Sequence, residues 1–152
     1  DASVARVTSA IEGGVASGAD LLLDGRESET PERGCFIGPT IFDNVPHDSA
    51  LATEEIFGPV LCVMTFRTPE EAISRANNSP YGLAAGVWTD KGSKIFEVAK
   101  KLDAGIIWCN TYNKFDAASP FGGFKESGYG REGGLQGLRP YVQLDTALGR
   151  KN

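Results

Sequence analysis

Strand-like and helix-like segments alternate through the middle of the sequence, and this order restricts the possible folds more than any other feature. The expected elements are a strand over 60–66, a helix over 69–77, a strand over 83–89, a helix over roughly 93–102 and a strand over 106–110. Strands that are joined through helices pair in parallel, and such connections are almost always right-handed. The sequence therefore predicts an α/β fold with a mostly parallel sheet and crossover helices.

The helix over 69–77 carries its own start signals. Thr68 is a capping residue, Pro69 takes the first helical position, and Glu71 follows three residues after the cap. A threonine with a glutamate three residues later satisfies two of the backbone N–H groups that a helix leaves unpaired at its start, and proline there loses no hydrogen bond. We expect the helix to end near Asn77.

Apolar residues near the N-terminus recur at spacings of three and four, at Val4, Val7, Ile11 and Val15. This periodicity predicts an amphipathic helix over 2–17 that stops at Gly18. The elements expected next are a short buried strand over 21–23, a strand over 35–45 that is broken by Gly38 and Pro39, and a helical turn over 48–54.

Two adjacent acids, Glu54 and Glu55, run into Ile-Phe-Gly-Pro directly before the strand over 60–66. The Gly-Pro pair fixes a tight entry into that strand. Glu55 and Phe57 would then lie at the mouth of a sheet, where α/β proteins commonly bind ligands. A carboxylate can accept two hydrogen bonds from a vicinal diol, and a ring can pack on a flat heterocycle. The spacing fits a nucleotide site, and it also fits a loop acid beside a core phenylalanine.

The charge balance argues against nucleic acids and anionic membranes as partners. The chain has 15 basic and 20 acidic residues, a formal net charge of -5, and its acids are spread along the sequence. No apolar run approaches the ~18 residues that span a bilayer. The N-terminus lacks the basic and apolar regions of a signal peptide. These observations make the cytoplasm the expected location.

Cysteine and histidine chemistry is sparse. The three cysteines are widely spaced without a ligand motif, which argues against a disulfide scaffold or a metal site. Cys62 and Cys109 lie in apolar strand-like runs and are expected to be small core residues, whereas Cys35 lies in a loop. The single histidine, His47, is expected at the surface, so the chain cannot assemble a nucleophile–histidine triad.

The segment over 111–137 is rich in glycine, serine and aromatic residues, and a loop of this length is usually functional. It contains a G-x-G-x-x-G match at Gly128–Gly133. A dinucleotide-binding turn needs a strand directly before the first glycine and a βαβ context. We expect neither here, so these glycines are interpreted as a tight loop. A closing strand is expected over Pro140–Leu148.

Three blocks, at 54–60, 75–85 and 119–128, together resemble the C-terminal part of the aldehyde dehydrogenase superfamily. The resemblance covers essentially the whole chain. It implies that residues 1–139 are the C-terminal portion of an aldehyde dehydrogenase-like catalytic domain and that residues 140–152 are a terminal oligomerisation strand and tail. It also implies a fragment, because the nucleophilic cysteine, the general base and the dinucleotide-binding domain would all lie upstream of Asp1.

The resemblance assigns roles to five residues of this chain. Glu55 looks like the acid that binds the nicotinamide ribose hydroxyls, and Phe57 like the ring beside that ribose. Phe115 looks like an aromatic wall of the aldehyde pocket, and Phe121 looks like the pocket's ring that backs the reacting centre. Arg131 looks like a residue that braces the active site from a subunit interface, and an ordinary loop ion pair is the alternative.

The implied reaction is oxidation of an aldehyde to a carboxylic acid with NAD or NADP, through a cysteine thioester formed outside this chain. The implied partners are an aldehyde substrate and further copies of the chain, which would assemble through Pro140–Leu148. The fragment by itself is expected to be inactive. No metal ion is expected in the site. The alternative is a noncatalytic subunit or interaction module derived from an aldehyde dehydrogenase.

Overall fold

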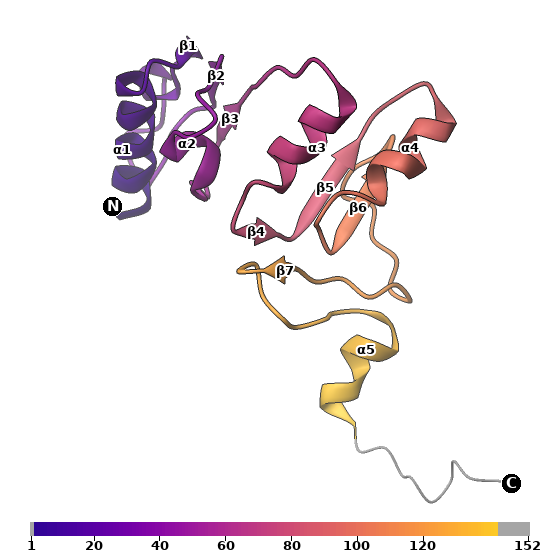
Figure 1. Ribbon diagram of the computed structural model, residues 1–152. Helices are drawn as coiled ribbons and strands as arrows, with labels where there is room; N and C mark the ends of the chain where they lie inside the picture. Colours follow the sequence, from indigo (N-terminus) through magenta and orange to yellow (C-terminus); the bar gives the residue numbers. More distant parts are fainter. Residues whose placement is uncertain (1, 143–152) are drawn as a thin grey trace, which may run out of the picture. The chain divides into compact units, whose positions relative to one another are not determined.

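The computed structural model describes residues 2–142, and the chain divides between Glu71 and Ala72 into two compact units. Figure 1 labels their helices and strands. We call them the N-terminal unit and the C-terminal unit. Within the described part of the chain, no helix is long and apolar enough to cross a membrane.

The N-terminal unit is a three-stranded sheet with two helices. Its elements are α1 (Ala2–Ala16), β1 (Asp20–Leu23), the 3-10 helix η1 (Gly25–Glu27), β2 (Thr40–Asp43), α2 (Ala50–Thr53) and β3 (Val60–Cys62). The strand order is β1-β2-β3. Strand β2 pairs antiparallel with β1 and parallel with β3, where Thr40 is opposite Val60. The parallel pair is connected through α2, as the α/β prediction requires.

The core of the N-terminal unit lies between α1, α2 and the sheet (Figure 1). Its buried members are Val7, Ile11, Ala19, Phe42, Val45 and Leu51. The helix predicted over 2–17 is confirmed, but its buried face is narrower than the apolar periodicity suggested, because Val15 is 47% exposed. Gly14 takes its place: an added Cβ would lie 2.8 Å from the ring of Phe42 and 2.6 Å from Leu51. The helix approaches the sheet closely at this glycine.

The strand predicted over 21–23 is present as β1, but its predicted burial is wrong. Leu22 is 64% exposed and Leu23 is 43% exposed. Strand β1 is an edge strand that pairs only with β2 among the described residues. An apolar triplet shows that a strand is favoured, but only tertiary neighbours decide whether its faces are covered.

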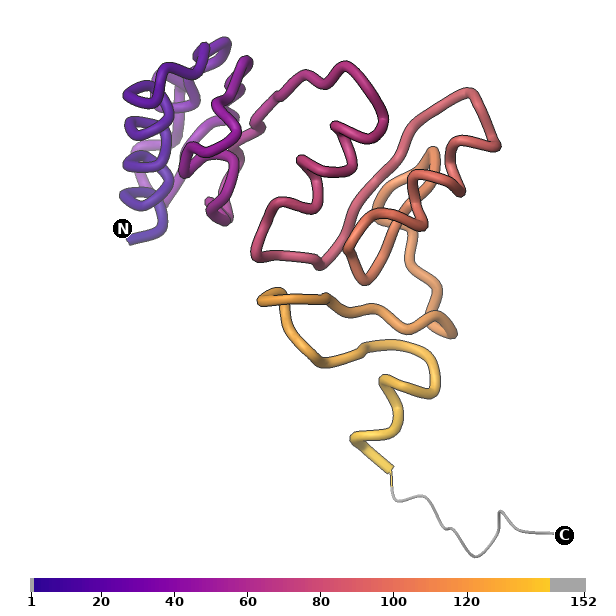
Figure 2. Tube along the Cα trace, viewed as in Figure 1, coloured from indigo at the N-terminus to yellow at the C-terminus, as the bar shows by residue number. Residues whose placement is uncertain are grey.

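The C-terminal unit contains two strand pairs. Its elements are the end of α3 (Pro69–Asn77), β4 (Tyr81–Gly82), β5 (Ala84–Val87), α4 (Gly92–Ala99), β6 (Ile106–Cys109), β7 (Phe124–Lys125), α5 (Gly134–Leu138) and the 3-10 helix η2 (Arg139–Tyr141). Strands β5 and β6 pair in parallel through the crossover helix α4, which packs beside both. Strands β4 and β7 pair antiparallel, and Figure 2 shows the chain turning back to form this pair.

The predicted fold class, α/β with parallel strands and crossover helices, is confirmed, with antiparallel pairs added at β1–β2 and β4–β7.

Helix α3 has the predicted bounds. The Thr68 Oγ1 accepts a hydrogen bond from the Glu71 backbone N–H at 3.2 Å, and the Glu71 carboxylate accepts one from the Arg67 N–H at 2.7 Å. The first bond is the cap that the sequence indicated, whereas the glutamate bonds the N–H one residue before the cap and not that of Thr68 itself.

The closing strand predicted over Pro140–Leu148 is wrong at its start. Arg139–Tyr141 form a 3-10 helix with Pro140 near its first turn. Proline has a φ that suits a helical start and no N–H to give to a neighbouring strand, so the helical conformation is favoured there. Residues 143–148 of this prediction lie outside the described residues.

The G-x-G-x-x-G segment at Gly128–Gly133 follows a strand that the sequence did not predict, β7. That strand has two residues and pairs antiparallel with β4, and α5, which follows Gly133, has five residues. A dinucleotide-binding turn lies between a parallel strand and a longer helix. Gly128 and Gly133 have φ values of 123° and 70°, so these positions favour glycine for the turn itself.

Candidate functional site

The segment Glu54–Gly58 leaves α2 in an extended conformation and then turns sharply at Phe57. Glu54 has φ -108° and ψ 145°, and its N–H closes the helix by bonding the Ala50 carbonyl at 2.9 Å. Phe57 has φ 49°, a left-handed conformation that costs a non-glycine residue about 1–3 kcal/mol. Its side chain is 82% exposed. The turn therefore presents an aromatic ring to the outside of the unit.

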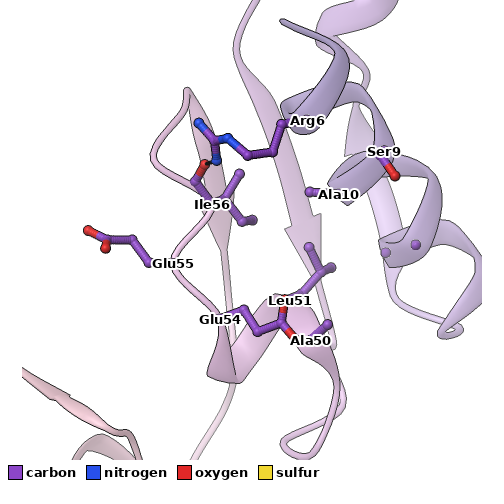
Figure 3. A pocket seen from close by; sticks show the side chains of 10 residues that line it. Arg6, Ser9, Ala10, Ala50, Leu51, Glu54, Glu55 and Ile56 are labelled. Atoms are coloured by element: carbon purple, nitrogen blue, oxygen red, sulfur yellow. Dashed lines mark hydrogen bonds between the residues drawn. The ribbon is translucent and has the colours of Figure 1, made fainter. Parts of the chain in front are cut away.

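A pocket of about 410 Å³ lies beside this segment. Its lining comes from α1, α2 and the segment itself: Arg6, Ser9, Ala10, Gly13, Gly14, Ala50, Leu51, Glu54, Glu55 and Ile56. Figure 3 shows Arg6 reaching from α1 to Ile56, and the exposed Glu55 carboxylate extending away from α1. Arg6 and the exposed Glu55 therefore line one hollow, and the exposed ring of Phe57 belongs to the same segment but not to the lining.

Phe115 and Phe121, which the sequence resemblance paired, meet in the C-terminal unit. Their ring centroids are 5.2 Å apart in an edge-to-face arrangement. Both line a pocket of about 470 Å³ together with Ile106, Trp108, Lys114, Asp116, Ala117, Ser119, Pro120, Glu132 and Gly133. A long glycine-rich loop therefore folds into one wall of a defined pocket.

Trp108 is a site residue that the sequence reading missed. Its side chain is 8% exposed, and its ring lies 5.6 Å from that of Phe115, edge to face. The indole N–H donates to the Lys114 carbonyl at 2.9 Å. A buried tryptophan needs such a partner, and a tryptophan in a strand that precedes an aromatic loop was the available signal. Trp108 therefore fixes the backbone directly before Phe115.

Arg131 makes contacts other than the loop ion pair considered from the sequence. Its guanidinium donates to the carbonyls of Gly123 and Gly130 at 2.9 and 2.8 Å, and it lies 5.5 Å from the centre of the Phe124 ring. A guanidinium over a ring is a favourable cation–π contact. Arg131 thus joins two turns of the loop, whereas its role at a subunit interface stays a prediction.

The described residues offer little nucleophilic or metal chemistry of their own. Partial burial raises the pKa of the Cys62 thiol above its ordinary value, which disfavours the reactive thiolate and agrees with a core role. From residue 2 to residue 142, no group of three histidine, cysteine, aspartate or glutamate side chains is placed to hold a metal ion.

The sequence matches the aldehyde dehydrogenase family over residues 1–147. The putative aldehyde dehydrogenase DhaS of Bacillus subtilis is 48% identical over 141 residues, which are 93% of this chain and 28% of that protein. Human retinal dehydrogenase 2 is 47% identical, with 93% of this chain and 27% of that protein covered. Among solved structures, the NAD+ complex of aldehyde dehydrogenase from Bacillus cereus is 47% identical with a TM-score of 0.87, covering 94% of this chain and 29% of that one.

The chain thus spans a little over a quarter of the length of the relatives that it matches. The match nevertheless includes both the Glu54–Gly58 segment and the aromatic loop that carries Phe115 and Phe121. Sequence identity near one half over more than nine-tenths of the chain, together with the common fold, leads to one assignment: this chain belongs to the aldehyde dehydrogenase family.

Proposed function

We propose that the protein containing this chain oxidises an aldehyde to a carboxylic acid with NAD+ or NADP+, and that this chain supplies part of the cofactor site and one wall of the aldehyde pocket. The observation that carries the proposal is the contact between Phe115 and Phe121 at 5.2 Å inside a single pocket. The names of the relatives support the same chemistry. We assign the nucleophilic cysteine and the general base to no residue of this chain.

The N-terminal unit has groups that fit a nicotinamide nucleotide. The exposed Glu55 carboxylate can accept two hydrogen bonds from the vicinal hydroxyls of a ribose. Phe57 is 82% exposed, and its ring is available to pack on a sugar or a flat heterocycle. When it is bound, such a cofactor would accept a hydride from the substrate. Glu55 and Phe57 would orient it.

The pocket of the C-terminal unit has walls that fit an aldehyde. Phe115, Phe121 and the largely buried Trp108 form a continuous aromatic surface along one side. Apolar walls exclude water from a reacting centre, and hydride transfer benefits from this exclusion. We propose that this surface contacts the organic part of the substrate.

The test compares Glu55→Gln with Glu54→Gln in the natural full-length gene product that contains this sequence. A hydrogen bond to a charged acceptor contributes about 1.5–3 kcal/mol. Glu55→Gln should therefore raise KM for the cofactor about tenfold to a hundredfold, with KM for the aldehyde nearly unchanged. NADH or NADPH formation is followed by absorbance. Glu54 is the matched control, and its variant should stay close to the wild type.

Two outcomes would contradict the proposal. Equal effects of Glu54→Gln and Glu55→Gln would remove the specific role of Glu55. A wild-type protein that neither binds the cofactor nor oxidises any of a panel of aliphatic and aromatic aldehydes would favour the noncatalytic subunit instead.

We propose further that residues 1–139 belong to the catalytic domain, that residues 140–152 form an oligomerisation tail, and that the protein is a cytoplasmic homo-oligomer. The tail contains several apolar residues within Pro140–Leu148, which suit contact with another subunit. Deletion of residues 140–152 from the natural protein should lower its mass in light scattering to that of a smaller assembly. An unchanged assembly would contradict this role. Fluorescence microscopy of a tagged gene product tests the location.

A further inference from the structure

The turn at Phe57 needs support from outside its own segment. Phe57 has a left-handed φ of 49°, which is unfavourable for a phenylalanine. The residue is 82% exposed, so burial of its side chain within this unit cannot stabilise the turn. Because the proposed cofactor residues Glu55 and Phe57 lie on either side of Ile56, whatever fixes this turn also fixes their directions.

Arg6 of α1 makes that contact from fifty residues away. Its guanidinium donates one hydrogen bond to the Ile56 carbonyl and a second, at 3.3 Å, to the Phe57 carbonyl. These two oxygens lie on either side of the Phe57 Cα, so their relative direction depends on the φ and ψ angles of Phe57. A guanidinium is planar and presents its donors in a rigid fork. Two bonds to one fork therefore hold both dihedral angles of Phe57.

The neighbouring residue of α1 secures the next position of the segment. Val7 is 3% exposed in the core, and a Cβ added to Gly58 would lie 2.6 Å from its side chain. Gly58 therefore packs directly against α1, one residue after the turn. Arg6 and Val7 together attach the segment to a helix whose position is set by the core.

We propose that Arg6 is a positioning residue for the cofactor: its fork holds Phe57 in the left-handed turn and so directs the Glu55 carboxylate and the Phe57 ring toward the nucleotide. The inference rests on the proposed function. It assigns to Arg6 an action through the backbone of Ile56 and Phe57, because its two bonds are made to their carbonyl groups. Figure 3 shows Arg6 reaching across to Ile56 while the Glu55 carboxylate extends to the other side.

The experiment measures NADH binding by fluorescence titration and steady-state kinetics in the natural full-length protein. Arg6→Met keeps most of the apolar stem and removes the fork. We expect it to weaken NADH binding and raise KM for NAD+ at least tenfold, with KM for the aldehyde unchanged. The matched control is Arg26→Met, which removes the same charge from an arginine paired with Asp24 in the same unit. It should bind NADH within twofold of the wild type.

Arg6→Lys separates the fork from the charge. Lysine keeps the positive charge but cannot supply two coplanar donors from one rigid group. We expect its NADH affinity to stay at least threefold below that of the wild type. Full recovery by lysine would overturn the proposal, because a point charge would then be sufficient. The proposal is also overturned if Arg6→Met binds NADH like the wild type.

The readouts also separate this inference from the proposed function. If the wild type does not bind NADH or oxidise aldehydes, the proposed function fails and the positioning role fails with it. If the wild type does both and Arg6→Met matches it, only the positioning role fails. Circular dichroism of each variant shows whether it is folded. If Arg6→Met does not fold, Arg6→Lys provides the decisive comparison.

Discussion

Replacement of Phe42 by alanine should lower the free energy of unfolding of the chain by about 3–5 kcal/mol, the usual cost of deleting a buried phenylalanine ring. Phe42 is fully buried at the centre of β2. Its ring reaches α1 at Gly14, where an added Cβ would lie 2.8 Å away, and it belongs to the same cluster as Ile11 and Leu51. Urea unfolding of the 152-residue chain, followed by far-UV circular dichroism, measures the loss.

Two further substitutions calibrate this expectation. Phe42→Leu keeps most of the buried volume and should cost clearly less than Phe42→Ala. Phe66→Ala removes the same ring from a position that is 60% exposed, and it should change the free energy of unfolding by only about 0.5 kcal/mol. Similar losses for Phe42→Ala and Phe66→Ala would show that the N-terminal unit does not depend on the core described above.

The parts of the fold that could be predicted are those determined by neighbouring residues. Helix α3 has the predicted bounds because its signals, Thr68, Pro69 and Glu71, all lie within its first turn. Helix α1 follows from the spacing of Val7 and Ile11. The parallel β5–β6 pair follows from the order of strand, helix and strand. In each case a local pattern is sufficient for the structure.

Other features depend on contacts between distant residues and leave no local pattern. Strand β7 forms only because Lys125 lies opposite Tyr81 in an antiparallel pair, and two residues are too few to show an alternation. Lys125 also has a positive φ and donates to the carbonyls of Asn77 and Ser79, which no propensity would indicate. The exposure of Leu22 likewise depends on which elements cover β1.

The candidate site likewise has residues that could be predicted from the sequence and residues that could not. Glu55 and Phe57 could be proposed from the sequence because they share one short segment ahead of a strand. The contact of Arg6 with the Ile56 carbonyl could not, since it joins α1 to a segment fifty residues later. Trp108 was overlooked because in the sequence it looks like any apolar residue of a strand. Its hydrogen bond to the Lys114 carbonyl exists only in the folded loop.

Replacement of Gly105 by alanine should affect both stability and the aldehyde pocket. An added Cβ would lie 1.8 Å from the Gly122 carbonyl oxygen, and 3.3 Å from the Gly123 Cα. These are backbone atoms, so no side-chain rotation can relieve the overlap and the loop itself must move. We expect a loss of about 3 kcal/mol, at the upper end of the usual cost of overpacking, measured by urea unfolding of the chain.

The displacement should reach the pocket because Phe121 directly precedes Gly122 and its ring contacts Phe115. The near-UV circular dichroism of the contacting rings of Trp108, Phe115 and Phe121 should change. KM for the aldehyde should rise in the natural full-length protein. Gly92→Ala is the matched control: nothing lies within 4 Å of its added Cβ at the start of α4, and alanine favours a helix. If Gly105→Ala is as stable as Gly92→Ala and keeps the same near-UV spectrum, then close approach of Gly105, directly before β6, to the Gly122 backbone does not hold the aromatic loop in place.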